Sequence, residues 1–67
     1  MEIRGRLARN LRRLREERGW SQEELADQAG LHRTYVSGIE RRVRNPTIEI
    51  LERLAKALGV KAGALID

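Results

Sequence analysis

The chain has 67 residues, a length that allows one small domain, and we expect residues 1–67 to fold as a single, marginally stable unit. The sequence contains no cysteine, which excludes a disulfide framework, a thiolate metal site and a thiol nucleophile. No apolar run approaches the roughly 18 residues that a membrane helix needs, and the N-terminus lacks a secretory signal, so we expect a cytoplasmic protein with no membrane partner.

The net charge of +4 is carried mainly by arginine, because only two of the 14 basic residues are lysines. Residues 1–18 carry a charge of +4, residues 19–32 carry −3, residues 33–46 carry +3 and residues 47–67 are neutral. Two basic segments therefore flank an acidic one. This distribution favours a surface for nucleic acid over a solubilising coat, and the planar guanidinium suits phosphate and guanine better than a lysine does.

The first predicted element is a helix over residues 2–18. Apolar residues recur there at helical spacing and form one stripe, flanked by arginines: Ile3, Leu7, Leu11 and Leu14. Gly19 supplies the C-terminal stop signal.

A second helix is predicted over residues 22–29 from an unusually complete start signal. Ser21 is the expected N-cap, Glu24 can close a capping box with it, and Trp20 can pack on the helix as a hydrophobic staple. Gly30 should end this helix in the left-handed conformation.

A third, short helix is predicted over residues 33–41, with Val36 and Ile39 facing inward. His32 stands at its expected N-cap, and a lone histidine without clustered ligands gives no metal site. Gly38 lies within this helix, where glycine costs about 1 kcal/mol relative to alanine. Two explanations are open for it: close packing against the second helix, or close approach to DNA.

A fourth helix is predicted over residues 47–58, after the chain break at Asn45-Pro46. Thr47 caps it, Gly59 closes it, and its apolar stripe is wide enough to face a core: Ile48, Leu51, Leu54, Ala55 and Leu58. A final turn or short helix covers residues 61–66. No segment alternates with a period of two, so the sequence predicts an all-α fold.

The second and third helices together predict a helix-turn-helix over residues 22–41. Two helices that cross steeply leave room only for a small side chain at the crossing, which Ala26 provides. The tight turn between them needs a residue with positive φ, which Gly30 provides. Leu25, Leu31, Val36 and Ile39 would fill the wedge between the two helices.

Most of the chain resembles a known family. Residues 21–60, SQEELADQAGLHRTYVSGIERRVRNPTIEILERLAKALGV, resemble the Cro/repressor-type (XRE) helix-turn-helix transcriptional regulators. Within that family, HRTYVSGIER followed by RNPTI looks most like the controller proteins of restriction–modification systems. The resemblance implies a five-helix, lambda-repressor-like fold and a homodimer that binds double-stranded DNA at a pseudo-palindromic operator. RNA polymerase is a further candidate partner.

Base contacts are expected from the third helix, because the second helix of a helix-turn-helix enters the major groove with its N-terminal residues on base edges. By position these residues are Arg33, Thr34 and Ser37. Arg33 is the candidate for guanine, whose O6 and N7 its guanidinium can bind together. The resemblance adds Tyr35 to the interface, with a core tyrosine as the alternative.

Phosphate contacts are expected on both sides of that helix. The resemblance assigns this role to Gln22 at the start of the second helix and to the residues after the third: Arg41, Arg42, Arg44 and Asn45. The first helix adds three further candidates: Arg12, Arg13 and Arg18. Arg42 departs from the family, which often has glycine or asparagine there, and left-handed geometry at this position would cost on the order of 1 kcal/mol.

Surplus apolar residues in the fourth helix and near the C-terminus predict a two-fold interface, for which Ile50, Val60 and Leu65 are the chosen residues. We expect no cofactor, no small-molecule ligand and no enzymatic activity, since the sequence has no nucleophile–base cluster and no glycine-rich phosphate loop. The alternative function is a helical protein-interaction module, such as an antitoxin or adaptor.

Overall fold

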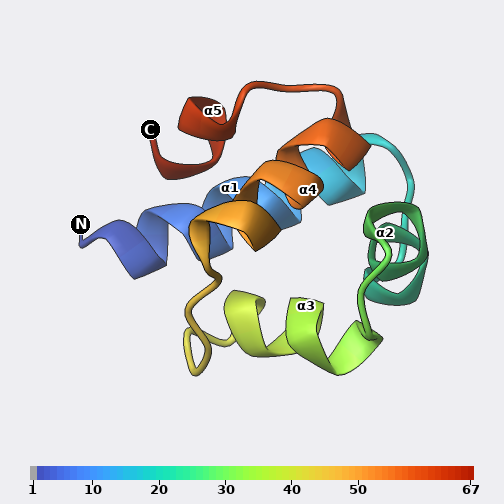
Figure 1. Ribbon diagram of the computed structural model, residues 1–67, viewed down its shortest axis with the longest axis horizontal. Coiled ribbons are helices and arrows are strands. Elements are labelled where there is room, and N and C mark those ends of the chain that lie inside the picture. The colour runs from blue at the N-terminus through green and yellow to red at the C-terminus, as the bar shows by residue number, and fades with distance from the viewer. Residues whose placement is uncertain (1) are drawn as a thin grey trace.

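The computed structural model describes residues 2–67, and within that range the chain forms five helices and no strand. The helices are α1 (Ile3–Glu17), α2 (Gln22–Ala29), α3 (Arg33–Glu40), α4 (Ile48–Leu58) and α5 (Ala62–Ile66), arranged as Figure 1 shows. Each boundary lies within one residue of the predicted one. No helix in residues 2–67 is long and apolar enough to cross a lipid bilayer.

The predicted N-caps of the middle helices are confirmed. Ser21 Oγ and Thr47 Oγ1 each accept a hydrogen bond from the backbone N–H three residues further on, at 3.0 Å and 3.1 Å. His32 caps α3 through Nδ1, which accepts from the backbone N–H of Thr34 at 3.2 Å. The predicted capping box is thus formed in its Ser21 half, in which the Ser21 hydroxyl accepts from the Glu24 N–H. The carboxylate of Glu24 accepts a hydrogen bond from the side-chain amide of Gln28 at 3.0 Å.

The first four helices end in the same hydrogen-bonded turn, in which one residue after the helix adopts a left-handed conformation. Three of these residues are glycines, with φ of 68° at Gly19 and 71° at Gly30 and Gly59. The fourth is Arg42, with φ of 65°, the single non-glycine residue with positive φ in residues 2–67. The left-handed geometry considered for this position is therefore present, and it costs about 1 kcal/mol.

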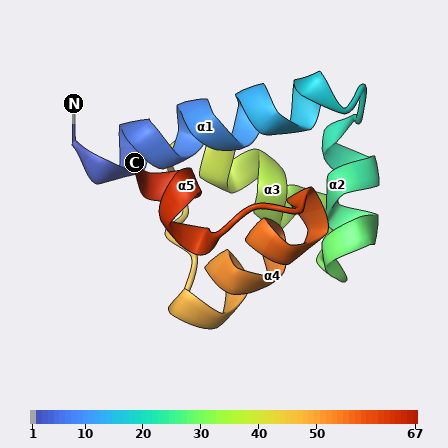
Figure 2. The same cartoon turned by 90° about the horizontal axis from the view of Figure 1, so that it is seen from above.

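All five helices contribute to one hydrophobic core, whose largest fully buried side chains are Leu11, Leu25, Val36, Ile39, Leu54, Leu58 and Leu65. Leu65 is 0% exposed, so its predicted place in a dimer interface is wrong. The reason is that α5 folds back between α1 and α4 (Figure 2), where the buried Asn10 side chain donates to the Leu65 carbonyl at 3.1 Å. Ile48, predicted to face the core, is 86% exposed because the first turn of α4, where it stands, borders an open groove.

The helix-turn-helix is formed by α2 and α3 as predicted. Ala26 is 2% exposed at the crossing, and its carbonyl accepts from the Leu31 N–H at 2.8 Å across the turn. Arg53 of α4 donates to the Gly30 carbonyl at 2.8 Å and so ties the turn to the rest of the domain. The turn is therefore held from both sides, and α3 lies along one side of the molecule (Figure 1).

Candidate nucleic-acid interface

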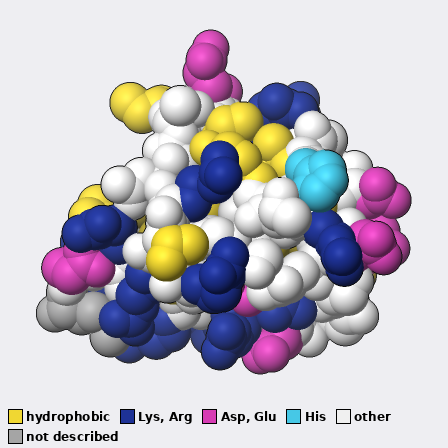
Figure 3. All heavy atoms as spheres, turned by 90° about the horizontal axis from the view of Figure 1, so that it is seen from below, with side chains coloured by type: hydrophobic (Ala, Val, Ile, Leu, Met, Phe, Trp, Pro, Cys, Tyr) yellow, Lys and Arg dark blue, Asp and Glu magenta, His cyan; other side chains and the backbone are white. Residues whose placement is uncertain are grey.

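One side of α3 is buried and the other faces solvent. Val36 and Ile39 are in the core, whereas Arg33 and Thr34 in the first turn are exposed. Ser37 is half-buried, and its hydroxyl accepts from Nε of Arg41 at 3.3 Å. Figure 3 shows the face of the molecule on which α3 lies, where a hydrophobic patch lies beside the histidine and many Lys and Arg side chains gather in the lower part of the view.

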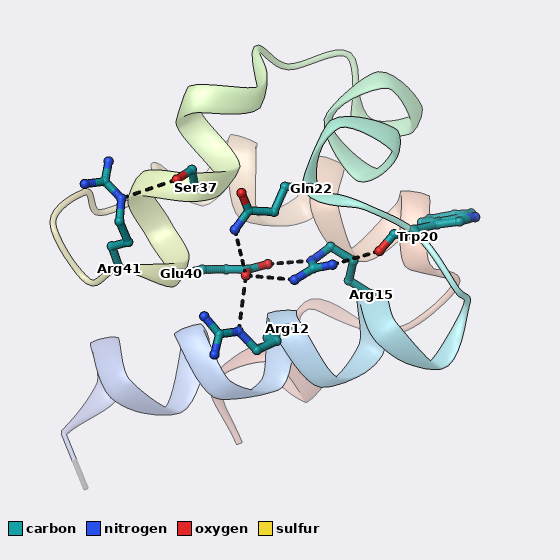
Figure 4. Close-up of polar contacts among 7 residues, drawn as sticks. All are labelled: Arg12, Arg15, Trp20, Gln22, Ser37, Glu40 and Arg41. Atoms are coloured by element: carbon teal, nitrogen blue, oxygen red, sulfur yellow. Dashed lines mark hydrogen bonds and ion pairs between the residues drawn. The ribbon is translucent and has the colours of Figure 1, made fainter.

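A buried carboxylate fixes the position of α3 against α1 and α2. The Glu40 side chain is 0% exposed and accepts from Arg15 Nε at 2.8 Å and Nη2 at 3.1 Å. It also accepts from the Gln22 amide at 3.0 Å and from Arg12 Nε at 3.4 Å. Figure 4 shows these three side chains converging on Glu40. We call Arg12, Arg15, Gln22 and Glu40 the Glu40 cluster.

Charge pairing holds Glu40 ionised within this cluster. Burial by itself would raise the pKa of Glu40, but the hydrogen bonds from Arg15, Gln22 and Arg12 and the charge of Arg15 outweigh it and lower the pKa below its ordinary value. The hydrogen bond to Glu40 in turn raises the pKa of Arg15. The pair therefore stays charged near neutral pH, and removing one partner would leave the other buried and uncompensated.

Gln22, Arg12 and Arg18, all predicted to contact phosphate, make contacts within the chain. Gln22 is half-buried at the first position of α2, with its amide directed to Glu40. Arg12 is 57% exposed while it binds Glu40, so part of its side chain still faces solvent. Arg18 donates to the carbonyls of Leu14, at 3.2 Å, and of Leu58. Arg18 thus caps the ends of α1 and α4, and its contact with phosphate stays a prediction.

A second group of arginines lines an open groove of about 600 Å³ between α1 and the segment after α3. Arg12, Arg13 and Arg9 come from α1, and Arg42 lies opposite them. Arg13 forms an exposed ion pair with Glu17 at 3.3 Å. The fold therefore brings the two basic segments of the sequence together at one groove.

Tyr35, Gly38 and Arg44 form a cluster on the surface of α3. The Arg44 guanidinium lies over the Tyr35 ring, 4.9 Å from its centroid. A Cβ at Gly38 would lie 3.1 Å from Cβ of Arg44, so the close neighbour of this glycine is the segment after α3 and not α2. Close approach of Gly38 to DNA stays a prediction. Tyr35 is half-buried and also packs against the core.

Asn45 is exposed and lines an apolar groove of about 390 Å³ at the other end of the segment after α3. The groove lies between the beginnings of α1 and α4 and the end of α5, and its walls include Ile3, Ile48 and Ile66. Ile3 is 50% exposed and Ile48 is 86% exposed. Ile50 and Val60, predicted for the dimer interface, are half-buried and pack against the core.

Sequence reasoning missed the polar residues that hold the domain together: Asn10, Arg15, Glu40 and Arg53. Two of them carried a readable signal. Arg15 stands four residues after Leu11, on the apolar stripe of α1, and Glu40 stands next to Ile39 on the buried side of α3. Opposite charges at core-facing positions of two helices indicate a buried pair. No group of three or more potential metal ligands occurs within residues 2–67.

Five helices, with α2 and α3 crossing at a glycine turn and the first turn of α3 exposed among arginines, define a helix-turn-helix domain. The chain belongs to the helix-turn-helix family, whose model matches residues 11–65.

Individual relatives agree with this assignment. The chain is 51% identical over 65 residues to a hypothetical transcription factor of Neisseria meningitidis serogroup B, covering 97% of this chain and 61% of that protein. A crystal structure of the Neisseria factor NHTF gives a TM-score of 0.95 at 50% identity, over 98% of this chain and 76% of that one. The chain therefore spans less than two thirds of the full length of the Neisseria relative.

Two controller proteins are also similar. The control protein C.SmaI of Serratia marcescens is 46% identical over 66 residues, which cover 98% of this chain and 79% of that protein. The restriction–modification controller protein C.Esp1396I, solved as a tetramer in complex with its natural 35 base-pair operator, gives a TM-score of 0.86 at 38% identity over 97% of this chain and 86% of that one. The predicted resemblance to the XRE regulators and their controller proteins is confirmed.

Proposed function

We propose that this chain is a sequence-specific DNA-binding transcriptional regulator that acts as a homodimer. The observation that carries the proposal is the exposed first turn of α3, which presents Arg33 and Thr34 while the Glu40 cluster fixes the helix behind them. A recognition helix held rigidly by the domain can enter the major groove without reorganising. The solved complex of the related C.Esp1396I with its operator supports this role.

Within this proposal, Arg33 and Thr34 read base edges, and Ser37 lies one turn further along the same face of α3. Arg33 binds O6 and N7 of a guanine, a contact that discriminates by about 1–3 kcal/mol. Phosphate contacts come from Arg41 and from the groove that Arg12, Arg13 and Arg42 share, and they fix the register without selecting sequence. A further phosphate contact comes from Gln22, which stands at the N-terminus of α2, where the free backbone amides favour an anion.

The partner in the homodimer is a second copy seated on the apolar groove that contains Ile3 and Ile48. The beginnings of α1 and α4 and the end of α5 gather at one end of the molecule, beside α3 (Figures 1 and 2). A two-fold axis at this end, if it runs parallel to the direction from the core to α3, leaves both α3 helices on the same side of the dimer (Figure 1). Half-sites about 34 Å apart, one turn of DNA, would then suit the pair.

We infer a binding function without catalysis, exercised in the cytoplasm on chromosomal DNA. Similarity to C.SmaI and C.Esp1396I supports a controller of a restriction–modification system as the narrower role. A regulator of that kind would respond to its own concentration through dimerisation and operator occupancy. RNA polymerase is then the natural further partner at the promoter.

Binding of fluorescent duplex DNA, single-stranded DNA and duplex RNA of equal length, each titrated at several salt concentrations, tests the proposed class. We expect duplex DNA to bind most tightly, with an affinity that falls steeply as salt rises. The paired variant Arg33→Ala with Thr34→Ala should weaken binding to duplex DNA, while Lys61→Ala, in the distant turn before α5, serves as the charge control. Absence of binding to any nucleic acid would leave the protein-interaction module as the function.

A further inference from the structure

We propose that His32, the residue before α3, determines which kind of base Thr34 reads, because the His32 ring takes up the hydrogen of the Thr34 hydroxyl. The inference rests on the proposed DNA-binding function, in which Thr34 contacts a base edge, and it names the base. That base is an adenine or a cytosine, whose exocyclic amino groups donate hydrogen bonds in the major groove.

The backbone at the start of α3 settles which ring nitrogen of His32 carries a hydrogen. The N–H of Thr34 donates to Nδ1 of His32 at 3.2 Å. A ring nitrogen that accepts from an N–H group must present its lone pair, so in this tautomer the hydrogen is on Nε2. The cap of α3 therefore makes Nδ1 an acceptor.

The same Nδ1 also lies close to the side chain of Thr34, at 2.8 Å from Oγ1. Because Nδ1 carries no hydrogen, the hydrogen between these two atoms must come from the Thr34 hydroxyl. Two lone pairs facing each other at this distance would repel, whereas an O–H group that donates to a nitrogen there makes an ordinary hydrogen bond. The Thr34 hydroxyl is thus fixed as a donor to His32.

This contact decides what Thr34 can offer to DNA. A free threonine hydroxyl can both donate and accept, but the single hydrogen of this one is directed to His32. Both residues are exposed, and the histidine lies on the face that carries α3 (Figure 3). Against a base edge Oγ1 can therefore accept from N6 of adenine or N4 of cytosine, but it cannot donate to O6 of guanine or O4 of thymine.

The caps of α2 and α4 provide the comparison. Ser21 and Thr47 each accept a backbone N–H through their own hydroxyl oxygen, from Glu24 and Ile50, whose side chains have no hydroxyl. Only at α3 does the capping side chain bind both the backbone and the hydroxyl of the residue that it caps. The helix proposed to read bases is thus the one whose cap also orients a polar side chain of its first turn.

The test begins with the duplex consensus that the unmodified protein recovers from randomised DNA, together with all single base-pair substitutions in one half-site. Thr34→Val keeps the shape of the side chain without the hydroxyl, so the position at which it loses discrimination is the base pair that Thr34 reads. We expect adenine or cytosine there. Replacing adenine by guanine, or cytosine by thymine, puts an acceptor in place of the amino group and should weaken binding of the unmodified protein about 3- to 10-fold.

Two changes at His32 separate its role toward Thr34 from capping. His32→Asn supplies an acceptor oxygen to both groups of Thr34 and should keep the preference. His32→Gly, a tolerated N-cap without a side chain, releases the hydroxyl hydrogen and should abolish the preference at that base pair, with discrimination at the position read by Arg33 unchanged. Ser21→Gly is the matched control, because it removes the side-chain cap of α2 and should leave every base preference as it was.

Three results would overturn the inference and leave the proposed function intact. They are a guanine or thymine at the position that Thr34 reads, a full preference retained by His32→Gly, and a Thr34→Val variant that discriminates normally at every position. Recovery of no consensus by the unmodified protein would overturn both.

Discussion

Single residues decide how this interface is built, and Arg42 is the clearest case. Gly19, Gly30 and Gly59 occupy the left-handed position after their helices at no steric cost, whereas Arg42 occupies the same position after α3 with φ of 65°. The strain is kept at a helix end that borders the arginine-lined groove. We infer that the side chain of Arg42 is retained for DNA at the expense of stability.

Arg42→Gly should therefore raise the free energy of unfolding by up to about 1 kcal/mol, measured by urea denaturation. The same change should weaken binding to all duplexes and flatten the salt dependence by about one charge per subunit. Gly19→Ala is the reverse control, because its added Cβ meets nothing within 4 Å and only its φ of 68° is strained. A less stable Arg42→Gly variant would mean that the arginine stabilises the turn.

The proposed role of Arg33 also depends on a single side chain, which is exposed in the first turn of α3. Arg33→Ala should cost about 1–3 kcal/mol of binding free energy and relax base preference at one position per half-site. Affinities for a panel of singly substituted operators measure this. A loss that is equal for every substituted operator would instead assign Arg33 to the phosphate backbone.

At the scale of the helices, the elements could be predicted from sequence, but the contacts that orient them could be predicted only in part. Caps such as Ser21 and Thr47 and stops such as Gly30 act within a few residues, so local sequence is sufficient to find them. The Glu40 carboxylate joins α1, α2 and α3, and the exposure of Ile48 depends on where α5 ends. Both depend on tertiary packing that helical periodicity does not specify.

The Glu40 cluster makes the stability of the domain depend on pH. Because the folded-state pKa of Glu40 lies below its ordinary value, ionised Glu40 stabilises the fold above the ordinary pKa of a glutamate. This contribution is lost as the pH falls through the lowered pKa. Urea denaturation between neutral pH and pH of about 3 should show the loss.

Glu40→Gln should destabilise the domain by about 3–5 kcal/mol at neutral pH, because Arg15 would remain buried without its charge partner. The variant should also lose part of the acid dependence. Glu17→Gln is the matched control, since Glu17 forms only an exposed ion pair with Arg13. Equal acid dependence in Glu40→Gln and in the unmodified protein would contradict this role for the cluster.

At the scale of the whole molecule, we propose that a second copy covers the exposed apolar end of the domain. The predicted interface residue Leu65 is in the core, whereas Ile48 is 86% exposed beside an apolar groove. Ile48→Glu should therefore yield monomers in sedimentation experiments without loss of helical circular dichroism. Val43→Glu, a change at a residue that is 69% exposed outside that groove, should leave the dimer intact. A persisting Ile48→Glu dimer would place the interface elsewhere.

The central claim, a dimeric reader of duplex DNA sequence, is tested most directly by a binding selection on randomised duplex DNA, with the salt dependence of the winning sequence measured alongside. We predict a two-fold-symmetric consensus whose half-sites lie about one helical turn apart, with a guanine in each half-site and an affinity that falls steeply as salt rises. Recovery of no consensus, together with weak and purely salt-dependent binding to all duplexes, would contradict the claim.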